Sequence, residues 1–225
     1  MALPSVSVVM PVGAGARFFR VALSCFLNQT YTGRLDVLVL DNSTQPIEHL
    51  LPQDERVKYL RCERMSIGAL RNLGAAHTVG DIIVNGDEDD WSSADRVAVQ
   101  LERLQAAGKS VTGFHNLLFY DTSDQRCYRY QYGGHPPYAV GTSQMYTRSW
   151  WGQHPFQAIS KGEDFWFQKD AADAGQLDSC DCGQLAVARG HGDSTCPPSF
   201  GRSAFPLVPS TSLPREFWLA VTARG

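Results

Sequence analysis

Short apolar runs alternate with helical patterns along the first half of the chain. Valine-rich runs at 5–11 and 35–41 are typical of strands that are buried on both faces of a parallel sheet. Between them, Phe19, Leu23 and Phe26 recur at helical spacing. The three segments therefore predict a strand-helix-strand unit, which is characteristic of α/β proteins.

The same alternation continues through the first half. Apolar runs at 56–61 and 81–86 predict two more strands, and the pattern between them predicts a helix with Gly80 as its C-cap. A further helix follows the fourth strand, where Ser92 and Asp95 resemble a capping box at its start. We expect these elements to form a nucleotide-binding type of lobe.

The second half has a less regular pattern. Strand-like runs at 111–120 and 126–132 precede one clear helical pattern at 163–175, and the residues after Cys196 are rich in proline. No linker separates the two halves. We therefore expect a single α/β domain with a Rossmann-like lobe followed by an irregular lobe.

Composition limits the class of protein. The 225 residues are 43% hydrophobic, enough for one globular domain with a sizeable core. The net charge of -3 and the absence of a basic run give no strong footprint for nucleic-acid binding. No apolar run reaches bilayer length, so we expect no transmembrane segment and a cytoplasmic location. The six cysteines form no C-x-x-C pair and are expected to be reduced thiols.

Four carboxylates follow the fourth predicted strand without interruption: Asp87, Glu88, Asp89 and Asp90. Adjacent carboxylates repel one another, and hard divalent ions such as Mg²⁺ and Mn²⁺ prefer oxygen ligands. The carboxyl end of a parallel strand is also where α/β sheets bind ligands. The cluster predicts a metal site, and a solvated acidic turn before a helix N-terminus is the alternative that the residues alone leave open.

A series of motifs spread along the chain resembles the family 2 inverting glycosyltransferases of GT-A fold. They occur in the family's order and spacing, and they cover the chain to about Thr195. The motifs are VSVVMP at 6–11, FLNQTY at 26–31, VLDNS at 39–43, ALRNLGAA at 69–76, the acidic turn ending at Trp91, MYTRSWWGQHPF at 145–156, GEDFWF at 162–167 and ARGHGDST at 188–195.

The resemblance implies a donor and a way of binding it. The donor would be a nucleotide diphosphate sugar, with UDP as the expected nucleotide. Pro11 and Asp41 would lie beside the base or ribose, Arg71 near the uracil or diphosphate, and Asp87 near the ribose or the metal. The acidic turn would be the family's D-x-D site for Mn²⁺ or Mg²⁺.

The resemblance also implies metal ligands and a catalytic pair. Asp89 would ligate the metal that bridges the two phosphates, Asp87 would approach it, and His191 would add a late contact. Asp164 would be the general base that takes the proton of the acceptor hydroxyl, and Glu163 would orient it or the acceptor. An ordinary helix-start preference for acidic residues is the alternative for this pair.

The implied fold is a single GT-A domain over residues 1–225 with a mixed central sheet. Within it we expect a nucleotide-sugar-binding lobe at 1–108, an acceptor and catalytic lobe at 109–195, and a C-terminal tail at 196–225. The acceptor bears a hydroxyl, and the sequence does not select among saccharide, lipid-linked, protein, small-molecule and modified-base acceptors.

Two other functions compete with sugar transfer. A nucleotidyltransferase acting on a sugar phosphate could wrap a triphosphate with the glycine-rich stretch at 13–17 and hold Mg²⁺ with the acidic turn. A non-catalytic sugar-binding module could stack sugar rings on Trp150, Trp151 or Trp166. A dehydrogenase is disfavoured, because Phe18 stands where the third glycine of a dinucleotide fingerprint belongs.

Overall fold

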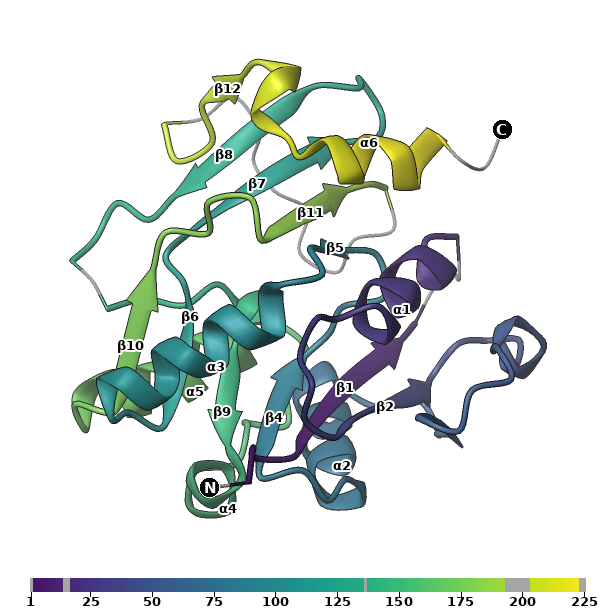
Figure 1. Ribbon diagram of the computed structural model, residues 1–225, viewed down its shortest axis with the longest axis vertical. Helices are drawn as coiled ribbons and strands as arrows, with labels where there is room; N and C mark the ends of the chain where they lie inside the picture. Colours follow the sequence, from purple (N-terminus) through teal and green to yellow (C-terminus); the bar gives the residue numbers. More distant parts are fainter. Residues whose placement is uncertain (1, 14–16, 136, 193–202, 223–225) are drawn as a thin grey trace.

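A seven-stranded mixed sheet forms the centre of the molecule. The computed structural model describes residues 2–13, 17–135, 137–192 and 203–222 (Figure 1). Most neighbouring strands of this sheet run parallel, and one strand, β9, runs antiparallel to both of its neighbours. The strands lie in the order β10 (Leu177–Cys180), β6 (Val111–Phe114), β9 (Met145–Thr147), β4 (Ile82–Asn85), β1 (Val6–Val12), β2 (Leu35–Asp41) and β3 (Val57–Arg61).

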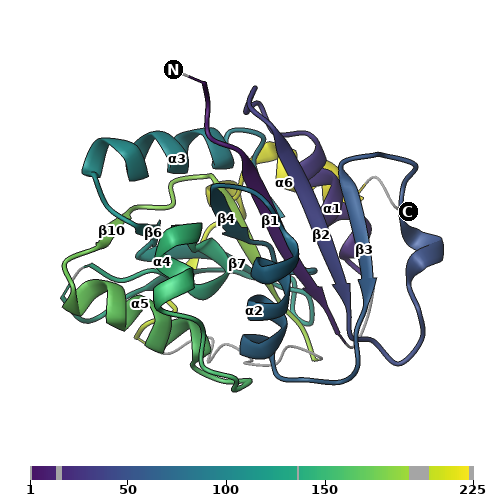
Figure 2. The same cartoon turned by 90° about the horizontal axis from the view of Figure 1, so that it is seen from below.

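Helices cover both faces of this sheet, which explains why its central strands are mostly apolar. The helices α1 (Phe19–Leu27) and α3 (Arg96–Ala107) pack on one face, and α2 (Ile67–His77), α4 (Arg148–Gln153) and α5 (Glu163–Asp173) pack on the other (Figure 2). Successive side chains of a strand point to opposite faces. The two helical layers therefore share the apolar side chains of β1, β2 and β4 between them.

A second, five-stranded sheet lies beside the first and carries the C-terminal helix α6 (Arg215–Thr222) (Figure 1). Phe217 of α6 is fully buried, and its ring meets that of Trp91 edge to face at 6.2 Å. Three short 3₁₀ helices lie at Glu48–Leu50 (η1), Gly141–Ser143 (η2) and Ser210–Ser212 (η3). The strand order is β12 (Leu207–Val208), β8 (Cys127–Gln131), β7 (Asn116–Asp121), β11 (Ala186–Gly190) and β5 (Trp91–Ser92).

The predicted α/β fold with a mixed central sheet is confirmed, and three local predictions are wrong. The run at 111–120 is broken at His115, so that β6 and β7 enter different sheets. Helix α2 ends with Thr78 as its C-cap; a Cβ on Gly80 would lie 2.5 Å from the amide nitrogen of Ser7, so close strand packing explains that glycine. Ser92 is a strand residue and caps no helix.

The lobe boundaries remain predictions. Helix α3 ends in the left-handed Gly108, at the expected end of the first lobe. Strands β6, β9 and β10, from beyond that point, nevertheless complete the first sheet. Cys196, where the expected tail begins, lies outside the described residues, and the five described cysteines are free thiols.

Within the described ranges, no helix has the length and apolar character needed to cross a membrane.

Candidate active site

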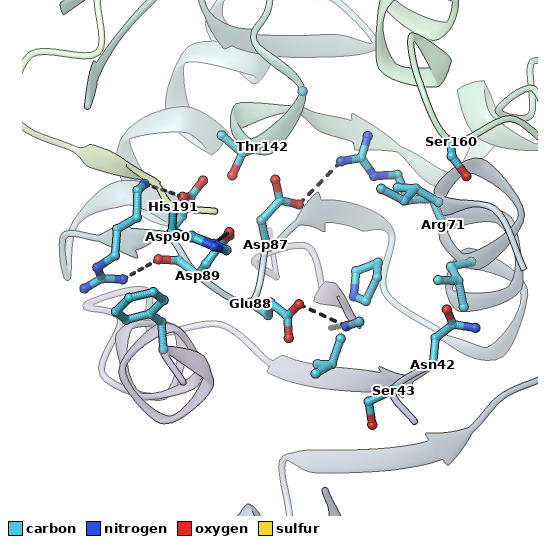
Figure 3. Close-up of a pocket in the computed structure, with 18 of the residues that line it drawn as sticks. Asn42, Ser43, Arg71, Asp87, Glu88, Asp89, Asp90, Thr142, Ser160 and His191 are labelled. Carbon is cyan, nitrogen blue, oxygen red and sulfur yellow. Dashed lines mark hydrogen bonds and ion pairs between the residues drawn. The ribbon is translucent and has the colours of Figure 1, made fainter. Parts of the chain in front are cut away.

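A cavity of about 1320 Å³ opens at the carboxyl ends of β1, β2 and β4. Its wall combines these strand ends with the first turns of α2 and α5 and with the end of β11 (Figure 3). Parallel strands bring their carboxyl ends to one edge, so residues far apart in sequence meet there. Of the residues predicted for the site, seven line this cavity: Pro11, Arg71, Asp87, Asp89, Glu163, Asp164 and His191.

Asp41 is the predicted site residue whose side chain does not line the cavity. Its carboxylate is fully buried and accepts hydrogen bonds from the amide of Ser43 at 3.0 Å, the amide of Ile47 at 3.0 Å and the hydroxyl of Tyr59 at 2.6 Å. Arg61 forms an ion pair with it at 2.7 Å. Burial alone would raise the pKa of Asp41, but the bonds from Ser43 and Tyr59 outweigh burial and the pKa lies below its ordinary value.

The buried Asp41 shapes the cavity through its neighbours. Asn42 and Ser43, which follow it directly, both line the cavity. Asn42 donates from Nδ2 to the carbonyl of Glu63 at 2.6 Å, which joins this turn to the loop before α2. The structure therefore places Asp41 as the anchor of a cavity-lining turn, and a contact between its carboxylate and the donor stays a prediction.

Glu88 connects the acidic turn to the end of β1. Its Oε1 accepts a hydrogen bond from the amide of Gly13 at 2.9 Å, while Oε2 is buried without a hydrogen-bond partner among the described residues (Figure 3). Burial, reinforced by the charges of Asp89 and Asp87, raises the pKa of Glu88 to about 8. The carboxyl is therefore largely protonated at neutral pH as long as no cation is nearby.

The pKa values of Asp87 and Asp90 are raised in the same way. Burial raises the pKa of both carboxyls, and the neighbouring acidic side chains add to the effect. Asp90 accepts a hydrogen bond from the amide of Arg189 at 3.0 Å, and the Arg189 guanidinium donates to the carbonyl of Asp89. The turn is thus held in shape by β11, and the pKa values of Asp87 and Asp90 stay raised even with Arg71 beside Asp87.

Asp89 and His191 meet across the cavity wall although they are about a hundred residues apart. Nε2 of His191 lies 2.7 Å from Oδ2 of Asp89, and the imidazole packs against the ring of Phe18 at 5.5 Å (Figure 3). Carboxylate oxygen is a preferred ligand of Mn²⁺, and neutral imidazole is a common metal ligand in proteins. The two side chains and the uncompensated carboxylates beside them fit a divalent cation, although the described residues contain no group of three or more His, Cys, Asp or Glu side chains in a metal-ligating arrangement.

Arg71 connects the acidic turn to the predicted catalytic helix. Its side chain is 5% exposed and forms ion pairs with Oδ1 of Asp87 at 3.4 Å and with Oε1 of Glu163 at 3.0 Å. Burial alone would lower the pKa of Arg71, but the Asp87 and Glu163 charges raise it. Arg71 therefore stays charged, and burial raises the pKa of Glu163 even with Arg71 beside it.

Asp164 occupies the first turn of α5, on the cavity wall. A Cβ on Gly141 would lie 2.2 Å from Oδ2 of Asp164, so a larger residue at 141 would displace this carboxylate from its present position. The structure therefore places the Asp164 carboxylate on the cavity wall, close to Gly141 of η2.

Two arginines that shape the site were missed by sequence reasoning. Arg189 lies within the ARGHGDST motif, two residues before His191, so the motif itself could have pointed to it. Arg96 is 1% exposed and donates to the carbonyls of Asn85 at 3.2 Å and Thr142 at 2.6 Å, directly beneath the acidic turn. An arginine in a helix pattern is usually solvated, and nothing local to the sequence signals this burial.

Solved structures and relatives identify the class. The fold is similar to crystal structures of TarS from S. aureus, residues 1–349, in complex with UDP (TM-score 0.65, 13% identity, 82% of this chain and 60% of that chain) and with UDP-GlcNAc (TM-score 0.65, 13% identity, 85% and 60%). The molecule thus has the GT-A fold of glycosyltransferases. Residues 7–166 match the family model described as glycosyl transferase family 2, and the chain belongs to that family.

Two curated relatives agree with this assignment. An uncharacterized glycosyltransferase of Haemophilus influenzae is 30% identical over 106 residues, which are 45% of this chain and 42% of that protein. EpsH of Bacillus subtilis, also named as a glycosyltransferase, is 30% identical over 99 residues, 42% of this chain and 29% of that protein. The matched region spans less than half the length of each relative.

Proposed function

We propose that the protein transfers a sugar from a nucleotide diphosphate sugar to an acceptor hydroxyl, with inversion at the anomeric carbon. One observation carries the proposal. The acidic turn with Asp89 and His191 and the carboxylate of Asp164 lie on the wall of one cavity, and Arg71 and Glu163 connect the two parts. Membership of family 2 and the UDP and UDP-GlcNAc complexes of the TarS structures support a nucleotide-sugar donor.

The donor would bind along the strand ends. Pro11 and the turn after Asp41 would line the base and ribose part, and the diphosphate would lie against the acidic turn. Asp89 and His191, with Asp87 beside them, would hold Mn²⁺ or Mg²⁺. Such a cation acts as a Lewis acid that stabilises the negative charge of the departing nucleoside diphosphate. Asp87 would keep its ion pair with Arg71, so that the turn stays in register with α5.

The acceptor would approach from the opposite side. Its hydroxyl oxygen attacks the anomeric carbon while the bond to the diphosphate oxygen breaks, and Asp164 takes the hydroxyl proton. Because displacement is in line and occurs once, the anomeric configuration inverts. Glu163, held by Arg71, would fix the first turn of α5. The acceptor itself is a hydroxyl compound of unassigned class.

The substitution Asp164→Asn tests this assignment. Asparagine keeps the shape of the side chain but cannot accept the proton at neutral pH. General-base catalysis contributes typically about 10²–10⁴-fold, so we expect kcat to fall by that range while UDP affinity, measured by calorimetry, stays unchanged. Asp170→Asn, an exposed change on the same helix, is the matched control and should leave kcat unchanged.

The products separate sugar transfer from the competing functions. Release of nucleoside diphosphate from a nucleotide sugar supports a glycosyltransferase, whereas release of pyrophosphate from a nucleoside triphosphate and a sugar phosphate would support a nucleotidyltransferase. Sugar binding without any turnover would support a binding module. A product that retains the donor's anomeric configuration, read from its NMR coupling constant, would remove Asp164 from the role of base.

A further inference from the structure

We infer that Gln144 is a positioning residue that sets the spacing between the acidic turn and Asp164 through a buried hydrogen-bond bridge under the cavity. This inference rests on the proposed function for its catalytic consequence. The bridge itself does not depend on the proposed function, because it is a set of hydrogen bonds that joins the end of β4 to the first turn of α5. Gln144 itself does not line the cavity.

The side-chain amide of Gln144 is fully buried, and both its nitrogen and its oxygen form hydrogen bonds. Nε2 donates to the carbonyl of Asp164 at 3.0 Å and to the carbonyl of Ala139 at 3.3 Å, and Oε1 accepts from Nδ2 of Asn85 at 3.4 Å. A buried amide that loses its hydrogen-bond partners destabilises the fold. The side chain is therefore stable in this place only while Asn85 and Asp164 keep their present separation.

Asn85 is the other half of the bridge and ends β4, two residues before Asp87. It is 1% exposed, and its amide nitrogen donates to the carbonyl of Gln144 at 3.0 Å. Nδ2 of Asn85 also donates to the carbonyl of Gly141 at 3.1 Å. Gly141 is the glycine that makes room for the carboxylate of Asp164. Asn85 thus holds Gly141 directly and holds the first turn of α5, which carries Asp164, through Gln144.

Arg96 ties the same two segments together a second time. Its guanidinium donates to the carbonyl of Asn85 and to that of Thr142, and its other bonds go to Ser92 at 2.8 Å and Gln100 at 3.0 Å. All these acceptors are neutral. The two carbonyl contacts of this buried guanidinium hold the end of β4 and the 3₁₀ helix η2 at a fixed separation.

The consequence for catalysis is geometric. The bridge connects the place where the donor's diphosphate would lie to the carboxylate that would take the acceptor's proton. A misplacement of about 1 Å in such a site can cost about 100-fold in rate. Gln144→Met keeps the length and burial of the side chain and removes the hydrogen bonds to Asn85, Ala139 and Asp164.

The experiment compares Gln144→Met with Asn116→Leu. Asn116 is a buried amide of the second sheet, outside the cavity, bonded to Asp181 and to the amide of Cys182, so its loss is a matched loss of buried hydrogen bonds. We expect Gln144→Met to lower kcat about 100-fold with unchanged calorimetric affinity for UDP in Mn²⁺. We expect Asn116→Leu to lower thermal stability and leave kcat unchanged.

Hydrogen exchange of the protein without added ligand gives a readout that does not depend on activity. Gln144→Met should speed the exchange of amides in α5, and Asn116→Leu should leave them unchanged. Exchange in α5 equal to that of the wild type, or an unchanged kcat, would overturn the inference. If the wild-type protein transfers no sugar, the proposed function is contradicted. If the amides of α5 nevertheless exchange faster in Gln144→Met than in the wild type, the hydrogen-bond bridge is still supported.

Discussion

Strands β2 and β4 lie on either side of β1 in the central sheet, and the aspartates at their carboxyl ends have pKa values shifted in opposite directions: Asp41 is the last residue of β2, and Asp87 follows the last residue of β4 by two positions. At the end of β2, Asp41 has hydrogen-bond donors on both oxygens and a lowered pKa. At the end of β4, burial raises the pKa of Asp87, Glu88 and Asp90. The comparison teaches that position at a strand end does not define a ligand site. We propose that the ligand binds where the buried carboxyls keep raised pKa values, as Asp87, Glu88 and Asp90 do.

The largest expected effect is the loss of activity when the acidic turn after β4 is changed. Asp89→Ala removes the carboxylate that meets His191, and we expect metal-supported sugar transfer to fall by at least about 100-fold, because outer-shell changes at metal sites already cost 10–100-fold. Steady-state kinetics across a Mn²⁺ titration measures it. Glu102→Gln, an exposed change on α3, is the control, and an equal loss in both variants would contradict the assignment.

For the free energy of unfolding we expect the reverse order: a change at Asp41 should cost more stability than a change at Asp89. Asp41→Asn leaves donors from Ser43, Ile47, Tyr59 and Arg61 around a side chain that can no longer accept from all of them, and we expect a loss of about 2–3 kcal/mol in the free energy of unfolding. Asp89→Asn removes mutual repulsion and should be neutral or stabilising without metal. Urea denaturation in EDTA compares them. A larger loss in Asp89→Asn would reverse the comparison.

The two strand ends should also differ in the pH dependence of stability. The folded pKa of Asp41 is lowered, so its contribution is present above the ordinary value of 3.8 and is lost as the pH falls. The folded pKa of Glu88 is raised from 4.5 to about 8, so stability in EDTA should fall as the pH rises through that interval. Melting curves of Glu88→Gln should lack most of this fall; an unchanged slope would show that Glu88 titrates normally.

The smallest effect is expected from one of the donors to Asp41. Tyr59→Phe removes the hydroxyl that donates to the buried carboxylate at 2.6 Å and should cost about 1 kcal/mol. Because Tyr59 does not line the cavity, affinity for UDP should be unchanged. Chemical denaturation and calorimetry on the same preparation check both statements, and weakened UDP binding would mean that the Asp41 network contacts the donor after all.

Much of the first sheet follows from local patterns. The run at 35–41 is apolar at five of its seven positions, and the strand β2 has these bounds, because a strand covered by helices buries side chains on both of its faces. The break at His115 carries no such signal, since both flanking runs are apolar and only the three-dimensional packing decides which sheet each joins. Helix α6 spans only eight residues after a proline-rich stretch, and the sequence pattern predicted no helix there.

The residues of the candidate site also fall into those that the sequence indicated and those that it did not. The motif resemblance located Asp89, His191, Glu163 and Asp164, and the structure brings these residues to one cavity. It could not reveal that Asp41 turns inward, because that depends on Tyr59 and Ile47, which only the folded chain brings close. Gln144 and Arg96 have no local signature either, since burial of a polar side chain is decided by tertiary partners.

Calorimetry of UDP binding tests most directly the claim that the end of β4, with its unsatisfied carboxylates, is the site where a cation joins the protein to the donor. The wild-type protein should bind UDP tightly in Mn²⁺ and weakly in EDTA, and Asp89→Asn should bind UDP weakly in both. Asp41→Asn, once shown to be folded, should retain the metal dependence. Equal UDP affinity with and without Mn²⁺ in the wild-type protein would contradict the account.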